Sequence, residues 1–252
     1  MIRAIFVAVI TFAYILIVGT PFLIYTLLTG NTDPIYNLGI SGAKLAVWLS
    51  GVHKEVHGLE KIPKHGAVIY MPNHQSNCDP PAVISVLPPV LVMAKKEFFQ
   101  IPVLGIAMRR RGFIPIDRRN RERAIAAVDQ AVRALKAGYS FLAFPEGTRS
   151  PDGRLQTFKK GLFVMAIKGG ASIVPVSVSG GRKVMPKDKF AIYPGSVRIT
   201  FHDAISTVGL EVADRQKVIN QTRQAILAGL DPEEWPAEPA GATGSRDTPV
   251  PS

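Results

Sequence analysis

The sequence contains a single cysteine, Cys78, among its 252 residues. An intrachain disulfide needs two cysteines and a four-cysteine zinc site needs four, so both are excluded. The composition therefore favours a reducing compartment. The sequence also lacks a Gly-x-Gly-x-x-Gly or Walker-type motif, which argues against a site that cradles a nucleotide.

Acidic residues are scarce, with 19 Asp and Glu against 30 Lys and Arg and a formal net charge of +11. The last 22 residues, 231–252, hold five acids and one Arg, so residues 1–230 carry +15. A body of this charge favours nucleic acid, an anionic membrane surface or phosphate-bearing substrates as partners. The segment 109–123 has seven Arg but only one aromatic residue, Phe113. Nucleic-acid surfaces interleave aromatic and basic residues, so we expect a solvated basic face and no nucleic-acid partner.

Charged residues are absent from Ala4 to Leu28. As a helix these 25 residues would be ~38 Å long, against ~30 Å for the hydrocarbon core of a bilayer. A signal peptide has a shorter apolar region, so the pattern predicts a membrane segment, which either spans or re-enters because Pro21 permits a bend. A second apolar stretch, 35–52, suits the membrane interface and a helix packed on the soluble domain equally well.

Charge also predicts on which side of the membrane the chain lies. Arg3 is the only charged residue in 1–32, whereas the chain to residue 230 is rich in Lys and Arg. By the positive-inside tendency, we expect the basic domain on the cytoplasmic side of a membrane, the inner membrane of a bacterium.

Short apolar strands alternate with helices from residue 65 onward. The expected strands are 67–71, 90–94, 113–116, 141–144, 173–178 and 197–201, and the expected helices are 80–86, 125–136, 158–167 and 211–227. Pro115 marks an edge strand or a bulge. This alternation predicts an α/β fold with a mixed, largely parallel sheet flanked by helices. We expect a membrane-anchoring helical segment at 1–56, a catalytic domain at 57–230 and a disordered, acidic and Pro-rich tail at 231–252.

The first motif that carries chemistry is Asn73-His74-Gln75-Ser76-Asn77-Cys78-Asp79-Pro80. Pro80 suits the first position of a helix with Asp79 as its N-cap, so the preceding loop could curl His74 back onto Asp79. The carboxylate would then hold one ring nitrogen and leave the other as a base. Taken alone, the octapeptide favours a plain cap and a loop histidine, because Asp-Pro caps are common. A metal site and a Cys78 nucleophile are weaker alternatives.

Two further motifs place arginines just past the ends of strands, in 113–119 and in 144–150. The planar guanidinium matches phosphate oxygens, and Gly147 allows the backbone to approach a ligand closely. Each motif alone is also compatible with a solvated basic loop in which Asp117 or Glu146 pairs locally.

Together the motifs make the sequence resemble the 1-acylglycerol-3-phosphate acyltransferases of the glycerolipid acyltransferase superfamily. The resemblance covers most of residues 65–180 and includes the Asn-His-x4-Asp block, Lys95-Lys96-Glu97-Phe98 with Ile101-Pro102 and Gly105, Ile116-Asp117-Arg118, Phe144-Pro-Glu-Gly-Thr-Arg149 and Val174-Pro175-Val176.

The resemblance implies roles for individual residues. His74 would be the general base and Asp79 would orient it, while Arg118 and Arg149 would bind the phosphate of the acceptor. The other implied substrate-binding residues are Lys96, beside an acyl channel, and Glu146, Gly147 and Thr148, which would shape the phosphate pocket. No metal or cofactor is expected.

The implied reaction moves a fatty acyl group from acyl-CoA or acyl carrier protein to the sn-2 hydroxyl of lysophosphatidic acid, giving phosphatidic acid. Related acyltransferases that act on glycerol 3-phosphate, another lysophospholipid or a lyso-aminolipid are the alternatives. A thioester is already activated, so direct attack by the hydroxyl suffices without an acyl-enzyme. The groups that could donate hydrogen bonds to the oxyanion are loop amides near His74, or the side chains of Lys95 or Lys96.

Overall fold

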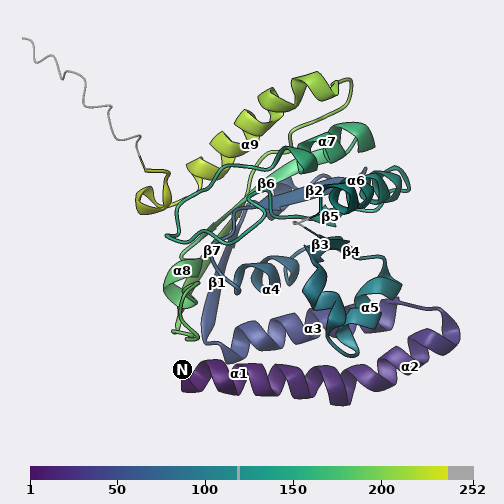
Figure 1. The fold of residues 1–252 in the computed structure, drawn as a ribbon. Coiled ribbons are helices and arrows are strands. Elements are labelled where there is room, and N and C mark those ends of the chain that lie inside the picture. Colours follow the sequence, from purple (N-terminus) through teal and green to yellow (C-terminus); the bar gives the residue numbers. More distant parts are fainter. Residues whose placement is uncertain (118–119, 238–252) are drawn as a thin grey trace, which may run out of the picture.

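The computed structural model describes residues 1–117 and 120–237, and Figure 1 shows the elements along the chain. The strands are β1 (Val52–His57), β2 (Val68–Pro72), β3 (Leu91–Lys95), β4 (Ile114–Ile116), β5 (Phe141–Leu142), β6 (Ser172–Ser179) and β7 (Gly195–Phe201). The α-helices are α1 (Ile2–Ala13), α2 (Gly19–Thr29), α3 (Asp33–Leu49), α4 (Asp79–Ile84), α5 (Leu104–Arg111), α6 (Arg121–Lys136), α7 (Lys160–Gly169), α8 (Gly181–Val184) and α9 (Arg215–Ala228).

The seven strands found in these residues form one sheet in the order β1-β7-β6-β2-β5-β3-β4. All neighbouring strands run parallel except β6 and β7, which are antiparallel. The prediction of a mixed, largely parallel sheet is therefore confirmed. β4 lies at one edge, where the missing N–H of Pro115 costs no ladder hydrogen bond.

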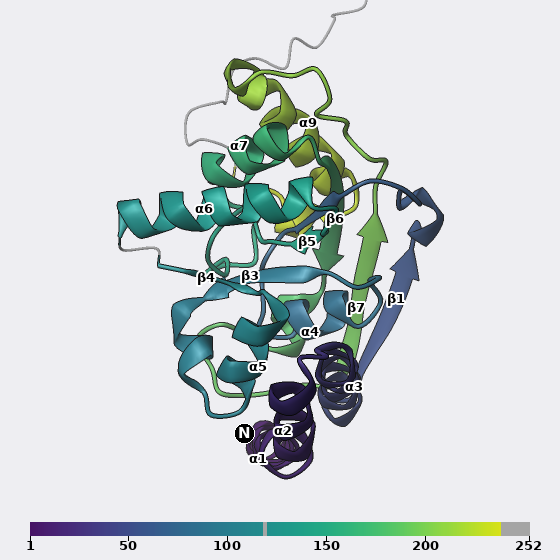
Figure 2. The same cartoon turned by 90° about the vertical axis from the view of Figure 1, so that its right-hand side faces the viewer.

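Apolar clusters fill both faces of the sheet, as expected where helices cover both faces. On one face the side chains of Ile69, Met71 and Phe141 pack with residues of α6, α7 and α9. On the other face Val68, Tyr70 and Val176 pack with residues of α3, α4 and α8. Figures 1 and 2 show these layers, with α1 and α2 lying beyond α3.

The N-terminal helices α1 and α2 are joined by a π-helical turn, Tyr14–Val18, into one rod that runs antiparallel to α3 (Figure 1). Its buried residues are Ala4 and Val7 in α1 and Gly19, Leu23 and Thr26 in α2. The π-helical turn, which accommodates one extra residue in the helix, lies between these two buried groups.

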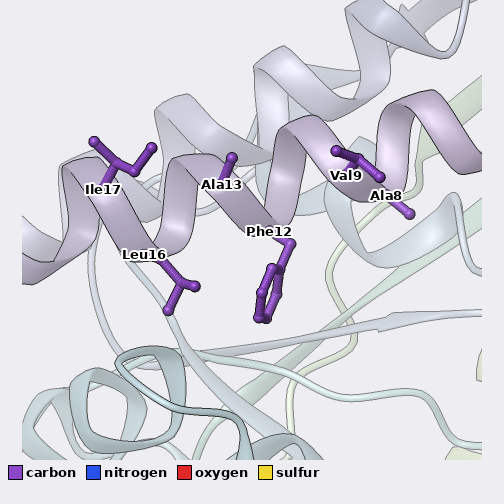
Figure 3. Close-up of a pocket in the computed structure, with 6 residues that line it drawn as sticks. All are labelled: Ala8, Val9, Phe12, Ala13, Leu16 and Ile17. Atoms are coloured by element: carbon purple, nitrogen blue, oxygen red, sulfur yellow. The ribbon is translucent and has the colours of Figure 1, made fainter.

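The opposite face of this rod is apolar and exposed. Among the described residues, Ile2–Thr29 is the helical segment long and apolar enough to cross a membrane, and 17% of its most apolar window is buried. A core helix of a soluble protein would be mostly buried, so that explanation does not fit. Ala8, Val9, Phe12, Ala13, Leu16 and Ile17 line a shallow hollow along α1 and the π-helical turn (Figure 3). The second apolar stretch forms α3, which packs between this rod and α4.

Two boundaries differ from the expected ones. The expected boundary at residues 56 and 57 cuts through β1, whose residues Val52–His57 pair with β7 and so belong to the sheet. The tail expected to be disordered from residue 231 begins with an ordered turn, Pro232–Glu234. The Glu234 carboxylate accepts hydrogen bonds from the Ser179 hydroxyl at 2.6 Å and the Gly180 amide at 2.9 Å, which fixes that turn on the sheet. Residues 238–252 lie outside the described residues.

Candidate active site

His74 and Asp79 meet in the loop that joins β2 to α4. The Asp79 Oδ2 atom lies 2.9 Å from His74 Nδ1 and also accepts the amides of Gln75 at 2.6 Å and Ser76 at 2.7 Å. Asp79 is fully buried, whereas the His74 side chain is 13% exposed. The loop therefore curls back in the way that the spacing allowed, with one imidazole nitrogen held and Nε2 free of hydrogen bonds to any described residue.

Asp79 does not cap α4 with its side chain. Cys78 occupies the N-cap position and Asp79 is the first helical residue, so the expected cap is corrected by one position. The physical reason is that Asp79 Oδ2 is already used by three donors of the loop. Its other oxygen, Oδ1, is buried without a hydrogen-bond partner among the described residues.

The backbone of the His74 loop is fixed from two sides. The Asn73 side chain pairs with the main chain of Val178, donating to its carbonyl at 2.8 Å and accepting its amide at 2.7 Å. This contact continues the pairing of β2 with β6. The Phe144 ring lies against the imidazole of His74, with ring centroids 4.3 Å apart.

Glu146 joins the arginine loop 144–150 to His74. Its Oε1 accepts the His74 amide at 2.7 Å, and its Oε2 accepts the Gln156 amide at 3.2 Å and the Gln156 side chain at 2.8 Å. The Ser150 amide donates to the His74 carbonyl at 2.7 Å. Burial raises the pKa of Glu146 to about 7, against the opposing effect of these hydrogen bonds. Both carboxylate oxygens thus bind the protein, which favours a positioning role over contact with substrate.

The rest of the arginine loop is more open. Gly147 has φ 73°, a backbone conformation that favours glycine. Thr148 is exposed, and its carbonyl accepts the Gln156 side chain at 3.1 Å. Arg149 is half-buried, and its carbonyl accepts the ammonium of Lys187 at 2.8 Å. Its guanidinium makes no hydrogen bond or ion pair within residues 1–117 and 120–237, so it is available for an anion.

Lys96 and Asp117 lie just past the ends of the neighbouring strands β3 and β4. The Lys96 ammonium lies 2.8 Å from Asp117 Oδ2. Lys96 and Asp117 line a hollow between β4 and α6, together with Pro115, Arg123, Ala126, Ala127, Gln130 and Arg133. Lys96 thus contacts this hollow rather than the His74 loop, and its predicted role in substrate binding stays a prediction. Arg118 lies outside the described residues.

Cys78 is buried with 2% exposure, and burial together with the neighbouring Asp79 raises the pKa of its thiol to about 12. The nucleophilic form of cysteine is the thiolate, which a pKa this high keeps unpopulated at neutral pH. These observations count against an acyl-cysteine. No cluster of three or more potential metal-ligating side chains occurs in the part of the chain that the structure describes.

Sequence reasoning missed Gly181, Ser150 and Gln156. A Cβ atom on Gly181 would lie 2.5 Å from Asp79 Oδ1, so only glycine leaves room for the buried carboxylate. The Gly180-Gly181 pair after a strand is a visible signal of such a close approach. Ser150 and Gln156 act through contacts between distant parts of the chain and leave no local signal.

Taken together, these contacts hold an imidazole whose outer nitrogen can accept a proton, in a loop that is hydrogen-bonded to the loop of Arg149. The amides of His74, Gln75, Ser76 and Cys78 all donate within the protein, so they are not free to stabilise an oxyanion. Such an arrangement can deprotonate a hydroxyl group next to a bound anion.

Comparison with known proteins identifies similar acyltransferases. The model of the acyltransferase family matches residues 53–179, which is 127 of the 252 residues. A 1-acyl-sn-glycerol-3-phosphate acyltransferase of Borreliella burgdorferi is 33% identical, and the alignment covers 75% of this chain and 76% of the relative. The solved structure of the 1-acyl-sn-glycerophosphate acyltransferase from Thermotoga maritima superimposes with a TM-score of 0.78, at 27% identity, over 90% of this chain and 93% of that one.

A chloroplastic 1-acyl-sn-glycerol-3-phosphate acyltransferase of Arabidopsis thaliana is 34% identical over 70% of this chain. The aligned region spans 49% of that plant protein, so this chain corresponds to about half of its length.

Proposed function

This chain belongs to the family of the 1-acyl-sn-glycerol-3-phosphate acyltransferases, and we propose that it transfers a fatty acyl group from a thioester to the sn-2 hydroxyl of lysophosphatidic acid. The product is phosphatidic acid, and the second product is the free thiol of the donor. The observation that carries the proposal is the 2.9 Å contact between His74 Nδ1 and Asp79 Oδ2, which leaves Nε2 as the base.

His74 Nε2 takes the proton of the acceptor hydroxyl as its oxygen forms a bond to the thioester carbonyl carbon. The tetrahedral intermediate collapses with cleavage of the carbon–sulfur bond, and the leaving sulfur receives the proton from the imidazolium. Asp79 keeps the imidazole oriented and stabilises its protonated form. The thioester is already activated, so the step needs no covalent acyl-enzyme, metal or cofactor.

The acceptor phosphate is bound by Arg149, whose guanidinium has no partner in the described part of the chain, and by Arg118 of the motif that precedes α6. A guanidinium binds phosphate oxygens through two parallel hydrogen bonds, which fixes the lipid headgroup as well as attracting it. Lys96 adds positive charge at the same edge of the sheet, where it pairs with Asp117.

The donor is acyl-CoA or acyl carrier protein, both of which are acidic and suit a chain of net charge +11. We place the protein on a membrane by the exposed apolar face of α1 and α2, because its product and acceptor are lipids. The opposite face of the rod packs on the domain, which favours insertion into one leaflet over a span that stands clear of the domain. The membrane is the inner membrane of a bacterium, and the basic domain lies on its cytoplasmic side.

The experiment is an acceptor competition with purified, full-length protein in detergent micelles. Lysophosphatidic acid, glycerol 3-phosphate, lysophosphatidylcholine and a lyso-aminolipid are offered together with acyl-CoA, and the acylated products are separated and quantified. We expect phosphatidic acid to dominate. A dominant product from another acceptor would replace the proposed substrate but keep the acyl-transfer chemistry. If no acceptor is acylated with acyl-CoA or with acyl carrier protein, the proposed function is wrong.

A further inference from the structure

The loop 185–194, between α8 and β7, presents aromatic and charged side chains to solvent. Phe190 is 67% exposed and Tyr193 is 47% exposed, and Asp188 and Lys189 between Lys187 and Phe190 are exposed as well. Two exposed rings in one short loop are costly in water. Aromatic rings and lysines together are the side chains favoured at the boundary between lipid and water.

This loop is packed directly on the N-terminal end of α1. Ile192 is buried and forms an apolar cluster with Ala4 and Val7 of α1, against which Met185 and Leu49 also pack. Figures 1 and 2 show the loop running beside α1. The loop and its exposed side chains therefore lie next to the N-terminal end of α1.

The same loop is tied to the arginine loop of the candidate active site. The Lys187 ammonium donates to the Arg149 carbonyl at 2.8 Å. The Arg182 guanidinium, in the helix just before the loop, donates to the Pro151 carbonyl. Any partner that binds loop 185–194 is consequently coupled to the position of Arg149.

We propose that loop 185–194 is a second membrane contact, which binds the headgroup layer of an anionic bilayer beside α1 and holds the Arg149 loop at headgroup level. The inference rests on the proposed membrane association through α1 and α2. A lipid surface is the occupant because the loop packs directly on α1, the helix that carries exposed Ile5, Phe6, Val9 and Phe12. Charge points the same way, since the protein carries +11 and anionic lipid attracts Lys and Arg.

The test uses full-length protein with a single fluorophore attached through an introduced cysteine. Asp188→Cys reports on the loop and leaves Phe190 and Tyr193 in place, while Val9→Cys reports on α1. Asp203→Cys is the matched control, because it lies past the far end of β7. Loop 185–194 precedes the near end of this strand, whose seven residues span roughly 20 Å. Cys78 is 2% exposed, and the unsubstituted protein gives the background labelling.

Each labelled protein is reconstituted into vesicles that contain nitroxide lipids, either with phosphatidylcholine alone or with phosphatidylglycerol added. We expect the Asp188 label to lose fluorescence almost as much as the Val9 label, and the Asp203 label to lose little. The loss at Asp188 should be larger with anionic lipid. The double substitution Phe190→Ser and Tyr193→Ser should reduce that loss, and should slow acyl transfer on vesicles but not in detergent micelles.

Quenching at Val9 with none at Asp188 would overturn the second contact while leaving the membrane association intact. The absence of quenching at both positions would overturn both. Protection of the Asp188 label by acyl carrier protein, with no effect of lipid, would reassign the loop to the donor and overturn the inference. Acyl transfer in micelles is measured separately, so failure of the enzymatic proposal is distinguishable from each of these results.

Discussion

Glu146→Gln separates the role that the sequence suggested for this residue from the role that its contacts favour. A residue that binds the acceptor affects the KM for lysophosphatidic acid, whereas a residue that positions the base affects kcat. In the structure Glu146 accepts one hydrogen bond from the His74 amide and two from Gln156. Glutamine keeps a carbonyl oxygen for His74 but turns an N–H₂ group toward the two Gln156 donors.

The size of the effect follows from these contacts. A buried donor left without its acceptor costs about 1–3 kcal/mol, so the loop 144–156 is expected to shift and the His74 backbone with it. A misplacement of about 1 Å in a catalytic group can cost roughly 100-fold in rate. We therefore expect kcat to fall by roughly 100-fold, with the KM for lysophosphatidic acid within about threefold of its original value.

Stability as a function of pH provides a second readout of the same residue. The pKa of Glu146 is about 7 in the folded protein against an ordinary value of 4.5. The folded protein holds the proton of Glu146 more tightly than the unfolded chain does. The protonated carboxyl therefore stabilises the fold fully below pH 4.5, and this stabilisation is lost as the pH rises through about 7. At about 1.4 kcal/mol per tenfold change in proton affinity, the loss is about 3 kcal/mol. Glu146→Gln should lack this pH dependence.

The assay combines steady-state kinetics with urea unfolding from pH 5 to pH 8. Glu60→Gln is the matched control, because Glu60 is exposed on the turn Leu59–Lys61. A rise of tenfold or more in KM with kcat unchanged, taken as about 1.4 kcal/mol of lost binding, would refute the positioning role. It would return Glu146 to the acceptor site.

Three further substitutions, with Gly39→Ala as a control for the third, test other contacts. Cys78→Ala should keep most of the activity, since a buried thiol with a pKa of about 12 is no nucleophile; a trapped acyl-enzyme in the parent, with an inactive variant, would contradict this. Asp79→Asn should lower kcat by roughly 10⁴-fold at unchanged fold, because an amide favours the wrong imidazole tautomer; activity within tenfold of the parent would remove Asp79 from the mechanism. Gly181→Ala places a Cβ atom 2.5 Å from Asp79 Oδ1 and should lower kcat. The control Gly39→Ala meets no atom within 4 Å and should stabilise α3 by about 1 kcal/mol. Equal activity of the two variants would show that the close approach at Gly181 does not matter.

The sequence predicted the architecture well where local patterns determine it. Short apolar runs bounded by turn residues correspond to β2, β3, β6 and β7, and Pro115 correctly marked the edge strand. β1 was not predicted, because Val52 ends an apolar stretch and Lys54 interrupts the apolar side of the strand between Val52 and Val56. Its place in the sheet depends on pairing with β7, which lies more than 100 residues further along the chain.

The candidate site was predictable in its residue types but only partly in its contacts. The spacing of His74, Asp79 and Pro80 allowed the curled loop but alone favoured a plain cap, and the pairing of His74 with Asp79 was expected only from the resemblance. The role of Glu146 was not predictable, because its partner His74 lies 72 residues away in the sequence. The acidic composition of the tail predicted disorder from residue 231, and this was wrong at Glu234, whose carboxylate binds Ser179 and Gly180.

The most direct test of the central claim is the release of free thiol from acyl-CoA by purified protein with lysophosphatidic acid present. Parent and His74→Ala proteins are compared in detergent micelles, with circular dichroism to verify that both are folded. We expect the parent to release one thiol per phosphatidic acid formed, and folded His74→Ala to release thiol no faster than the sample without enzyme. Comparable thiol release and phosphatidic acid formation by folded His74→Ala would contradict the account, because the hydroxyl would then lose its proton without the base that the site holds beside Asp79.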